Sequence, residues 1–200
     1  MTSIKANSGL RVIVTGAGEG IGFACASAFA ARGAELILTD HDPVALTRAA
    51  DFLGAYSRFC DVLSETSAEI FADEIEQDFG SFDVLVNAAG NAFVRTLGMM
   101  RMSKALLPVL RRGDGGRLVF NLEPSGEPCL KHQLFPHAGS QSGFRTLSDA
   151  LAAQTRGSSI GVVTITADRN PDTIAERIVG IVRTARPEWR SRPPSTRRRA

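Results

Sequence analysis

Short apolar runs alternate along the chain with segments whose apolar residues recur at helical spacing. The runs lie at residues 12–14, 36–38, 84–86, 118–120 and 162–165, with a weaker one at 56–60. Because the runs are continuous, they predict strands covered on both faces, as in a parallel sheet. The intervening stripes predict amphipathic helices, and the first stripe is Ile21, Ala24, Cys25, Ala28 and Phe29. This alternation predicts one doubly wound α/β domain of six strands, with helices on both faces of the sheet.

Two helix starts are marked by a capping residue followed by proline. Asp42 precedes Pro43, and Asn170 precedes Pro171. Asp and Asn side chains accept hydrogen bonds from the first-turn N–H groups, and proline suits the first helical position. We therefore expect helices to begin at these two prolines.

The composition is that of an ordinary globular protein. Of 200 residues, 44% are hydrophobic and 22% are charged, which argues against disorder or a disulfide scaffold. No apolar run approaches the roughly 18 residues that a membrane helix needs, and the polar start lacks a signal-peptide pattern. Three scattered cysteines are typical of reduced thiols, so we expect a cytoplasmic protein.

The positive charge is concentrated at the end of the chain. Residues 183–200 contain seven arginines and one glutamate, so the rest is mildly acidic. Helical periodicity ends near residue 186, which predicts a domain over 1–185 and a poorly ordered Arg/Pro-rich tail over 186–200. The tail has a single aromatic residue, Trp189. We interpret the tail as a solvated end and expect no nucleic-acid partner.

A glycine-rich segment joins the first predicted strand to the first predicted helix. Its glycines are Gly16, Gly18, Gly20 and Gly22. A turn this tight needs residues without Cβ, and a helix beginning near Gly20 directs N–H groups and a positive dipole end at the space before it. A pyrophosphate fits that space. Gly16, Gly20 and Ile21 are therefore predicted to hold a pyrophosphate, with Gly18 and Glu19 in the same loop.

Asp40 follows the second predicted strand, 24 residues after Gly16. A carboxylate there can accept both hydroxyls of an adenosine ribose and repels a 2′-phosphate. Glu19 adds a second negative charge nearby, and no arginine stands beside Asp40. These features predict NAD as the cofactor in preference to NADP. The alternative is that Asp40 only ends a strand and Asp42 only caps a helix.

These motifs together resemble the short-chain dehydrogenase/reductase family. The segment TGAGEGIG matches the family's glycine loop, and SKALLPVL and GGRLVFN match its fourth helix and fifth strand, over about residues 10–166. The resemblance implies a Rossmann-type fold, a nicotinamide cofactor and oxidoreductase ancestry. It also implies that Asp61 and Val62 contact adenine and that the NAAG segment lines the cofactor. That segment is Asn87, Ala88, Ala89 and Gly90.

The catalytic residues that the family uses are not in this sequence. The family transfers a proton through a Tyr, lowers the pKa of that Tyr with a Lys four residues later, and adds a Ser and a helix-four Asn. The chain has one tyrosine, Tyr56, and the residue four positions later is Cys60. Placing the family pattern on the chain puts other residue types at the four positions: Glu123 for Ser, His137 for Tyr, Gln141 for Lys and Arg95 for Asn.

Three functions remain open from the sequence. The first is a degenerate family member that binds NAD(H) with impaired or absent hydride transfer. The second is an active oxidoreductase of a small molecule in which Glu123 and His137 form the acid/base pair. The third is a non-catalytic structural or regulatory subunit.

Two further sites are weighed on spacing alone. Cys129, His132 and His137 are too few and too close in one loop to predict a metal site, so none is expected. By the resemblance, the fourth and fifth helices would build a homodimer. The residues expected at that interface are Met99, Leu106, Leu147 and Leu151.

Overall fold

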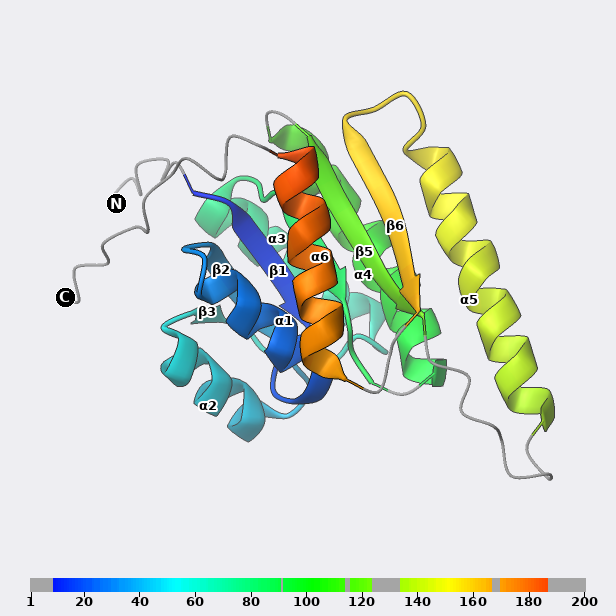
Figure 1. Ribbon diagram of the computed structural model, residues 1–200, viewed down its shortest axis with the longest axis horizontal. Coiled ribbons are helices and arrows are strands. Elements are labelled where there is room, and N and C mark those ends of the chain that lie inside the picture. The colour runs from blue at the N-terminus through cyan, green and yellow to red at the C-terminus, as the bar shows by residue number, and fades with distance from the viewer. Residues whose placement is uncertain (1–8, 91, 114–115, 124–133, 167–169, 187–200) are drawn as a thin grey trace.

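The computed structural model describes residues 9–90, 92–113, 116–123, 134–166 and 170–186. In chain order the elements are β1 (Arg11–Thr15), α1 (Gly20–Ala30), β2 (Glu35–Thr39), α2 (Pro43–Leu53), β3 (Tyr56–Ser57), α3 (Glu65–Phe79), β4 (Val84–Asn87), α4 (Ala92–Arg112), β5 (Arg117–Glu123), α5 (Leu134–Gln154), β6 (Ile160–Thr166) and α6 (Pro171–Ala185). All strand pairs are parallel, in the order β3-β2-β1-β4-β5-β6 (Figure 1). The predicted doubly wound α/β architecture is confirmed.

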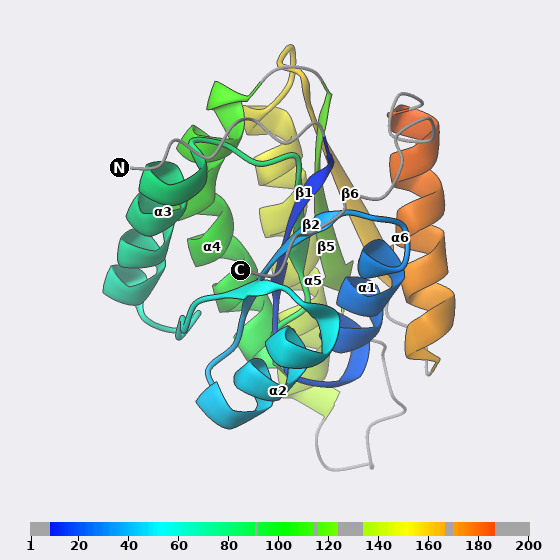
Figure 2. The same cartoon turned by 90° about the vertical axis from the view of Figure 1, so that its left-hand side faces the viewer.

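The helices cover both faces of the sheet. Figure 2 shows α1 and α6 on one side of the strands and α3 and α4 on the other. Successive side chains of a strand point to opposite faces, so Val12 and Val14 pack with Phe29 and Ile178, whereas Ile13 packs with Phe71. This burial on both sides explains why β1, β2, β4 and β5 appear in the sequence as continuous apolar runs. The run at residues 162–165 lies in the edge strand β6, which is only partly buried, so the expected cover on both faces is wrong there.

The two predicted helix starts are confirmed. The Asp42 side chain accepts hydrogen bonds from the N–H groups of Val44 and Ala45, and α2 begins at Pro43. Asn170 caps α6 in the same way, at Pro171. The two caps fix the directions in which α2 and α6 leave the sheet.

The third strand is shorter than the run at residues 56–60 predicts, because only Tyr56 and Ser57 pair in the β2–β3 ladder. The chain nevertheless continues beside β2. The N–H of Arg58 donates to the Leu38 carbonyl, and the N–H of Cys60 donates to the Asp40 carbonyl. The backbone after β3 is therefore held at the carboxyl end of β2.

The end of α6 is attached to the sheet. Arg186 is the first residue of the predicted tail. Its guanidinium pairs with the carboxylate of Asp83, which lies just before β4. Residues 187–200 lie outside the described residues, so the predicted tail stays a prediction.

Candidate functional site

A cavity of about 390 Å³ lies where the chain leaves β1, β2 and β4. The order of the sheet reverses between β1 and β4, and ligands of doubly wound proteins bind at such a switch point, outside the carboxyl ends of the strands. The cavity falls in the usual size range of small-molecule sites. It brings together eight predicted residues: Gly16, Glu19, Gly20, Ile21, Asp40, Ala88, Gly90 and Arg95.

The glycines shape the turn in front of α1. A Cβ on Gly22 would lie 2.0 Å from the Gly16 carbonyl oxygen, so only glycine lets α1 start this close to β1. Gly20 has φ 57° and open space where a Cβ would be. Glu19 is the N-cap of α1 but makes no side-chain capping bond. The first-turn N–H groups of α1 therefore face open space with no side-chain cap, which suits a pyrophosphate.

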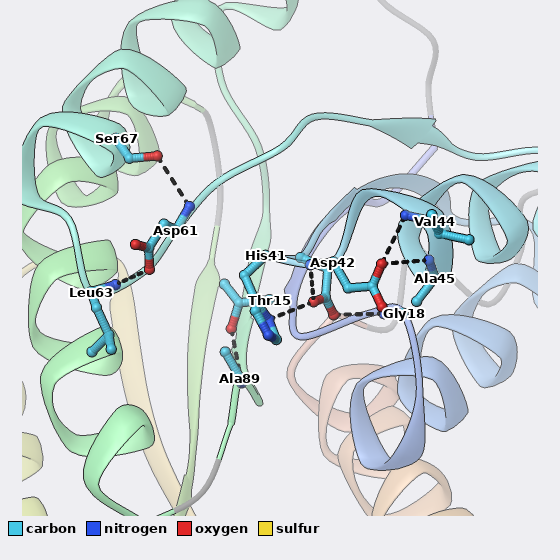
Figure 3. A network of polar contacts seen from close by, with 11 residues as sticks. Thr15, Gly18, His41, Asp42, Val44, Ala45, Asp61, Leu63, Ser67 and Ala89 are labelled. Carbon is cyan, nitrogen blue, oxygen red and sulfur yellow. Dashed lines mark hydrogen bonds and ion pairs between the residues drawn. The ribbon is translucent and has the colours of Figure 1, made fainter.

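Three donors fix the Asp40 carboxylate. Asp40 is buried, and its Oδ2 accepts a hydrogen bond from Gly18 N at 2.9 Å. Its Oδ1 accepts from Asp42 N at 3.0 Å and pairs with His41 Nδ1 at 2.9 Å (Figure 3). A carboxylate offers about four lone-pair positions, so these donors leave little unused acceptor capacity. The His41 side chain is 79% exposed, so its contact is the one of the three that faces solvent.

The turn after β4 is tied to the end of β1. Thr15 Oγ1 accepts hydrogen bonds from the N–H groups of Ala88 and Ala89, at 3.1 and 3.3 Å. The buried Asn87 amide donates to Asn121 of β5 at 2.9 Å and to the Ser103 hydroxyl of α4 at 3.2 Å. Asn87 and Ala89 thus support the cavity from behind rather than line it.

Asp61 and Val62 also lie outside the cavity lining. Asp61 Oδ1 accepts a hydrogen bond from Leu63 N at 2.9 Å, and Figure 3 shows both beside Ser67, apart from His41. Val62 packs so closely on α4 that a Cβ at Gly98 would lie 2.7 Å from it. Their adenine contact stays a prediction.

Arg95 enters the cavity from the first turn of α4. Its Nε donates to the Gly90 carbonyl at 2.8 Å. Burial lowers the pKa of Arg95 from its usual value, because water is excluded from around the guanidinium. Arg95 reaches the site because α4 begins at Ala92, almost directly after the β4 turn.

Glu123, at the position where the family has its serine, is bound to other residues. It is buried, and its carboxylate accepts from Arg145 Nε and Nη2 and from Thr166 Oγ1. This bidentate pair with Arg145, together with Thr166, occupies both carboxylate oxygens. His137 and Gln141 belong to α5, but their side chains lie outside the described residues, so a Glu123–His137 pair is not tested.

Four lining residues were missed by the sequence analysis as cavity residues: Gly22, His41, Asp42 and Ala45. Three of them immediately follow Asp40 or lie in the first turn of α2. The Asp-x-Asp-Pro pattern was a signal for them, because a helix cap two residues after Asp40 faces the same opening as Asp40.

A second cavity, of about 320 Å³, lies between α4 and α5. Of the expected interface residues, Met99, Leu147 and Leu151 line it, whereas Leu106 packs fully buried inside the monomer. Among the described residues, no helix is long and apolar enough to cross a membrane, and no cluster of three metal-binding side chains occurs. Cys129 and His132 lie outside them.

The fold and the cavity define a Rossmann-type α/β protein with a glycine-rich turn at its switch point. Residues 11–168 match the family model of the short chain dehydrogenases, so the chain belongs to this family of nicotinamide-dependent oxidoreductases.

The curated relatives align with about three quarters of this chain. D-threitol dehydrogenase of Mycolicibacterium smegmatis is 30% identical over 175 residues, which cover 76% of this chain and 67% of that protein. The probable oxidoreductase EphD of Mycobacterium tuberculosis is 29% identical over 177 residues, but these are only 30% of its length. The crystal structure of a metagenomic short-chain oxidoreductase in complex with NADP has the same fold. Its TM-score is 0.75 at 24% identity, covering 87% of this chain and 90% of that one.

Proposed function

We propose that this chain binds NAD(H) in the cavity beside β1, β2 and β4 and lacks the family's standard hydride transfer between alcohols and carbonyls. Asp40 carries the first half of the proposal. It is a buried carboxylate, fixed by three donors, on the lining of a cavity that also contains the glycine turn. A ribose with two free hydroxyls is the partner that such a carboxylate accepts.

Different residues around the cavity are proposed to hold different parts of the nucleotide. The N–H groups at Gly20 and Ile21 would hold the pyrophosphate, and Asp40 would hold the adenosine ribose. Asp61 and Val62 are proposed for the adenine, and the segment 87–90 for the middle of the cofactor. Bound NAD(H) supplies the hydride acceptor or donor, so the protein must supply the proton and the substrate orientation.

The single tyrosine is in the wrong place to supply that proton. The Tyr56 ring makes an edge contact with Phe79 at 4.9 Å, and the Phe79 ring lies 5.0 Å from the Arg11 guanidinium. Arg11 is the first residue of β1, so this group lies near the amino end of the sheet. The cavity is at the opposite, carboxyl end. Glu123 stands at the position that the resemblance gives to the catalytic Ser, and both of its carboxylate oxygens are already bound by Arg145 and Thr166.

The preference for NAD follows from charge. The 2′-phosphate of NADP would come close to Asp40, and Glu19 and Asp42 line the same cavity. Repulsion between charges a few ångströms apart at a partly buried site amounts to several kcal/mol. We expect NAD to bind at least about tenfold tighter than NADP, a difference of about 1.4 kcal/mol.

Calorimetric titration with NAD, NADH and NADP tests binding and preference together. Asp40→Asn should weaken NAD binding and reduce the difference in affinity between NAD and NADP. Asp51→Asn, which removes an exposed charge from α2, should change neither quantity. NADP binding more tightly than NAD in the unaltered protein would contradict the role of Asp40. Complete absence of nucleotide binding would favour the structural or regulatory subunit.

A hydride-transfer assay on a panel of alcohols and carbonyls tests the second half. We expect no turnover above background. Turnover that His137→Ala abolishes would instead support the alternative, an active oxidoreductase using Glu123 and His137.

We also propose a homodimer through α4 and α5 and a cytoplasmic location. The apolar cavity that Met99 and Leu147 line between these helices supports the dimer. The buried, unpaired thiols of Cys25 and Cys60 support a reducing compartment.

A further inference from the structure

The Arg95 guanidinium lines the proposed nucleotide cavity. In the described part of the chain, the Gly90 carbonyl is its single hydrogen-bond acceptor, and it forms no ion pair there. Glu19 and Asp40 line the same cavity, yet neither carboxylate binds it. A guanidinium has five N–H donors, so most of the hydrogen-bonding capacity of Arg95 is unused.

A partly desolvated cation with unused donors favours an anion. Burial lowers the pKa of Arg95, which shows that the charged form loses hydration at this place. The loss is recovered when an anion enters, because charge-assisted hydrogen bonds are stronger away from water. Lining the same cavity, the start of α1 offers N–H groups and a positive dipole end at Gly20 and Ile21. Two positive features from different elements thus face one space.

The order of the strands decides which anion they meet. Arg95 follows β4, and Asp40 follows β2, with β1 and its glycine turn between them. Neighbouring strands lie about 4.8 Å apart, so the β2 and β4 ends are separated by about 10 Å. A phosphate on the ribose held at Asp40 would be far from Arg95. A diphosphate on the glycine turn would lie between the two.

We infer that Arg95 is a phosphate-binding residue, which pairs with the diphosphate of a bound nucleotide. This inference rests on the proposed function and adds a residue to the same site. It assigns to Arg95 a role in binding instead of the supporting role of the helix-four Asn at whose position it stands. It also restores a positive charge beside the cofactor in a chain that has Gln141 at the family's lysine position.

Competition titrations with adenosine, ADP and NAD separate the possibilities. In Arg95→Met we expect ADP and NAD to bind about 10- to 100-fold more weakly, the range for a lost bond to a charged group, and adenosine to bind unchanged. Arg95→Lys should recover part of the loss, because it keeps a point charge. Arg111→Met removes the same charge from α4, 16 positions and about 24 Å along the helix, and should change none of the three.

Several results would overturn the inference. Equal weakening of adenosine and ADP would assign Arg95 to the shape of the site, and unchanged ADP binding would remove it from the site. A loss for 2′,5′-ADP but not for ADP would assign it to the 2′-phosphate instead. Should Arg95→Met fail to fold, the salt dependence of ADP binding by Arg95→Lys is measured instead. A salt dependence no steeper than that of uncharged adenosine would also contradict the inference. Failure of the unaltered protein to bind NAD would refute the proposed function itself.

Discussion

A Gly16→Ala substitution tests how closely the glycine turn and the β4 turn are packed. Gly16 has φ 65°, and an added Cβ would lie 2.6 Å from the Cα of Ala89 and 2.9 Å from its nitrogen. The left-handed conformation costs a non-glycine residue about 1–2 kcal/mol. Overpacking against backbone adds about 1–3 kcal/mol, so we expect a loss of about 2–5 kcal/mol in the free energy of unfolding. At about 2–4 °C per kcal/mol for a domain of this size, Tm should fall by roughly 4–20 °C.

Gly157→Ala is the matched control for this measurement. Gly157 has φ 81° but open space where the Cβ would stand, so its cost is the conformational term alone. Thermal and urea unfolding of both variants, followed by circular dichroism, isolate the contact with Ala89. If both variants lose the same free energy of unfolding, the close approach of Gly16 to Ala89 is refuted, because the added methyl group would then meet no resistance from the Ala89 backbone. If the approach is real, Gly16→Ala also moves the β4 turn and weakens NAD binding, which Gly157→Ala leaves intact.

Three further outcomes are expected. First-turn N–H groups lower the pKa of Asp42, so its charge stabilises the fold above the unfolded pKa of about 3.9, and this gain is lost as pH falls through the folded pKa. The unfolding free energies of the unaltered protein and of Asp42→Asn should therefore converge in acid. A difference between them that stays constant with pH would contradict this. A double-mutant cycle by urea unfolding on Glu123→Gln and Arg145→Gln should show coupling, with the double variant more stable than the two single losses add up to; strict additivity argues against the pair. Met100 lines the cavity between α4 and α5, so sedimentation should show Met100→Arg shifted to monomer and Ile70→Arg, at a more exposed apolar position on α3, unchanged; a dimer that survives Met100→Arg would contradict the α4–α5 interface.

The architecture was predictable because local physics determines it. Short continuous apolar runs that alternate with helical stripes favour the strands of a parallel sheet. Asp42-Pro43 and Asn170-Pro171 fix helix starts through hydrogen bonds to N–H groups at most three residues away. The glycine turn and Asp40 were predictable for the same reason. Both are defined by their distance from a strand end, which the sequence shows directly.

The rest depends on contacts between distant segments. Arg95 lies in the cavity because α4 starts almost directly after β4. The sequence shows that this connection is short, but it does not show in which direction the first turn of α4 points. Glu123 is paired with Arg145, which lies 22 residues later on another element. The sequence shows both residue types but not that they meet.

The proposed cofactor site and the positions that the resemblance gives to the catalytic Tyr and Lys lie in different parts of the fold. Gly16, Gly22 and Asn87 are held by strand ends and by core contacts with β1, β4 and β5, so changing them costs stability whatever the protein binds. The positions at which the family has its Tyr and Lys, 137 and 141, belong to α5. Selection for folding alone therefore preserves the cavity at the ends of β1, β2 and β4. This agrees with the proposal that the chain binds NAD(H) without the family's standard hydride transfer, which the titrations and the hydride-transfer assay test separately.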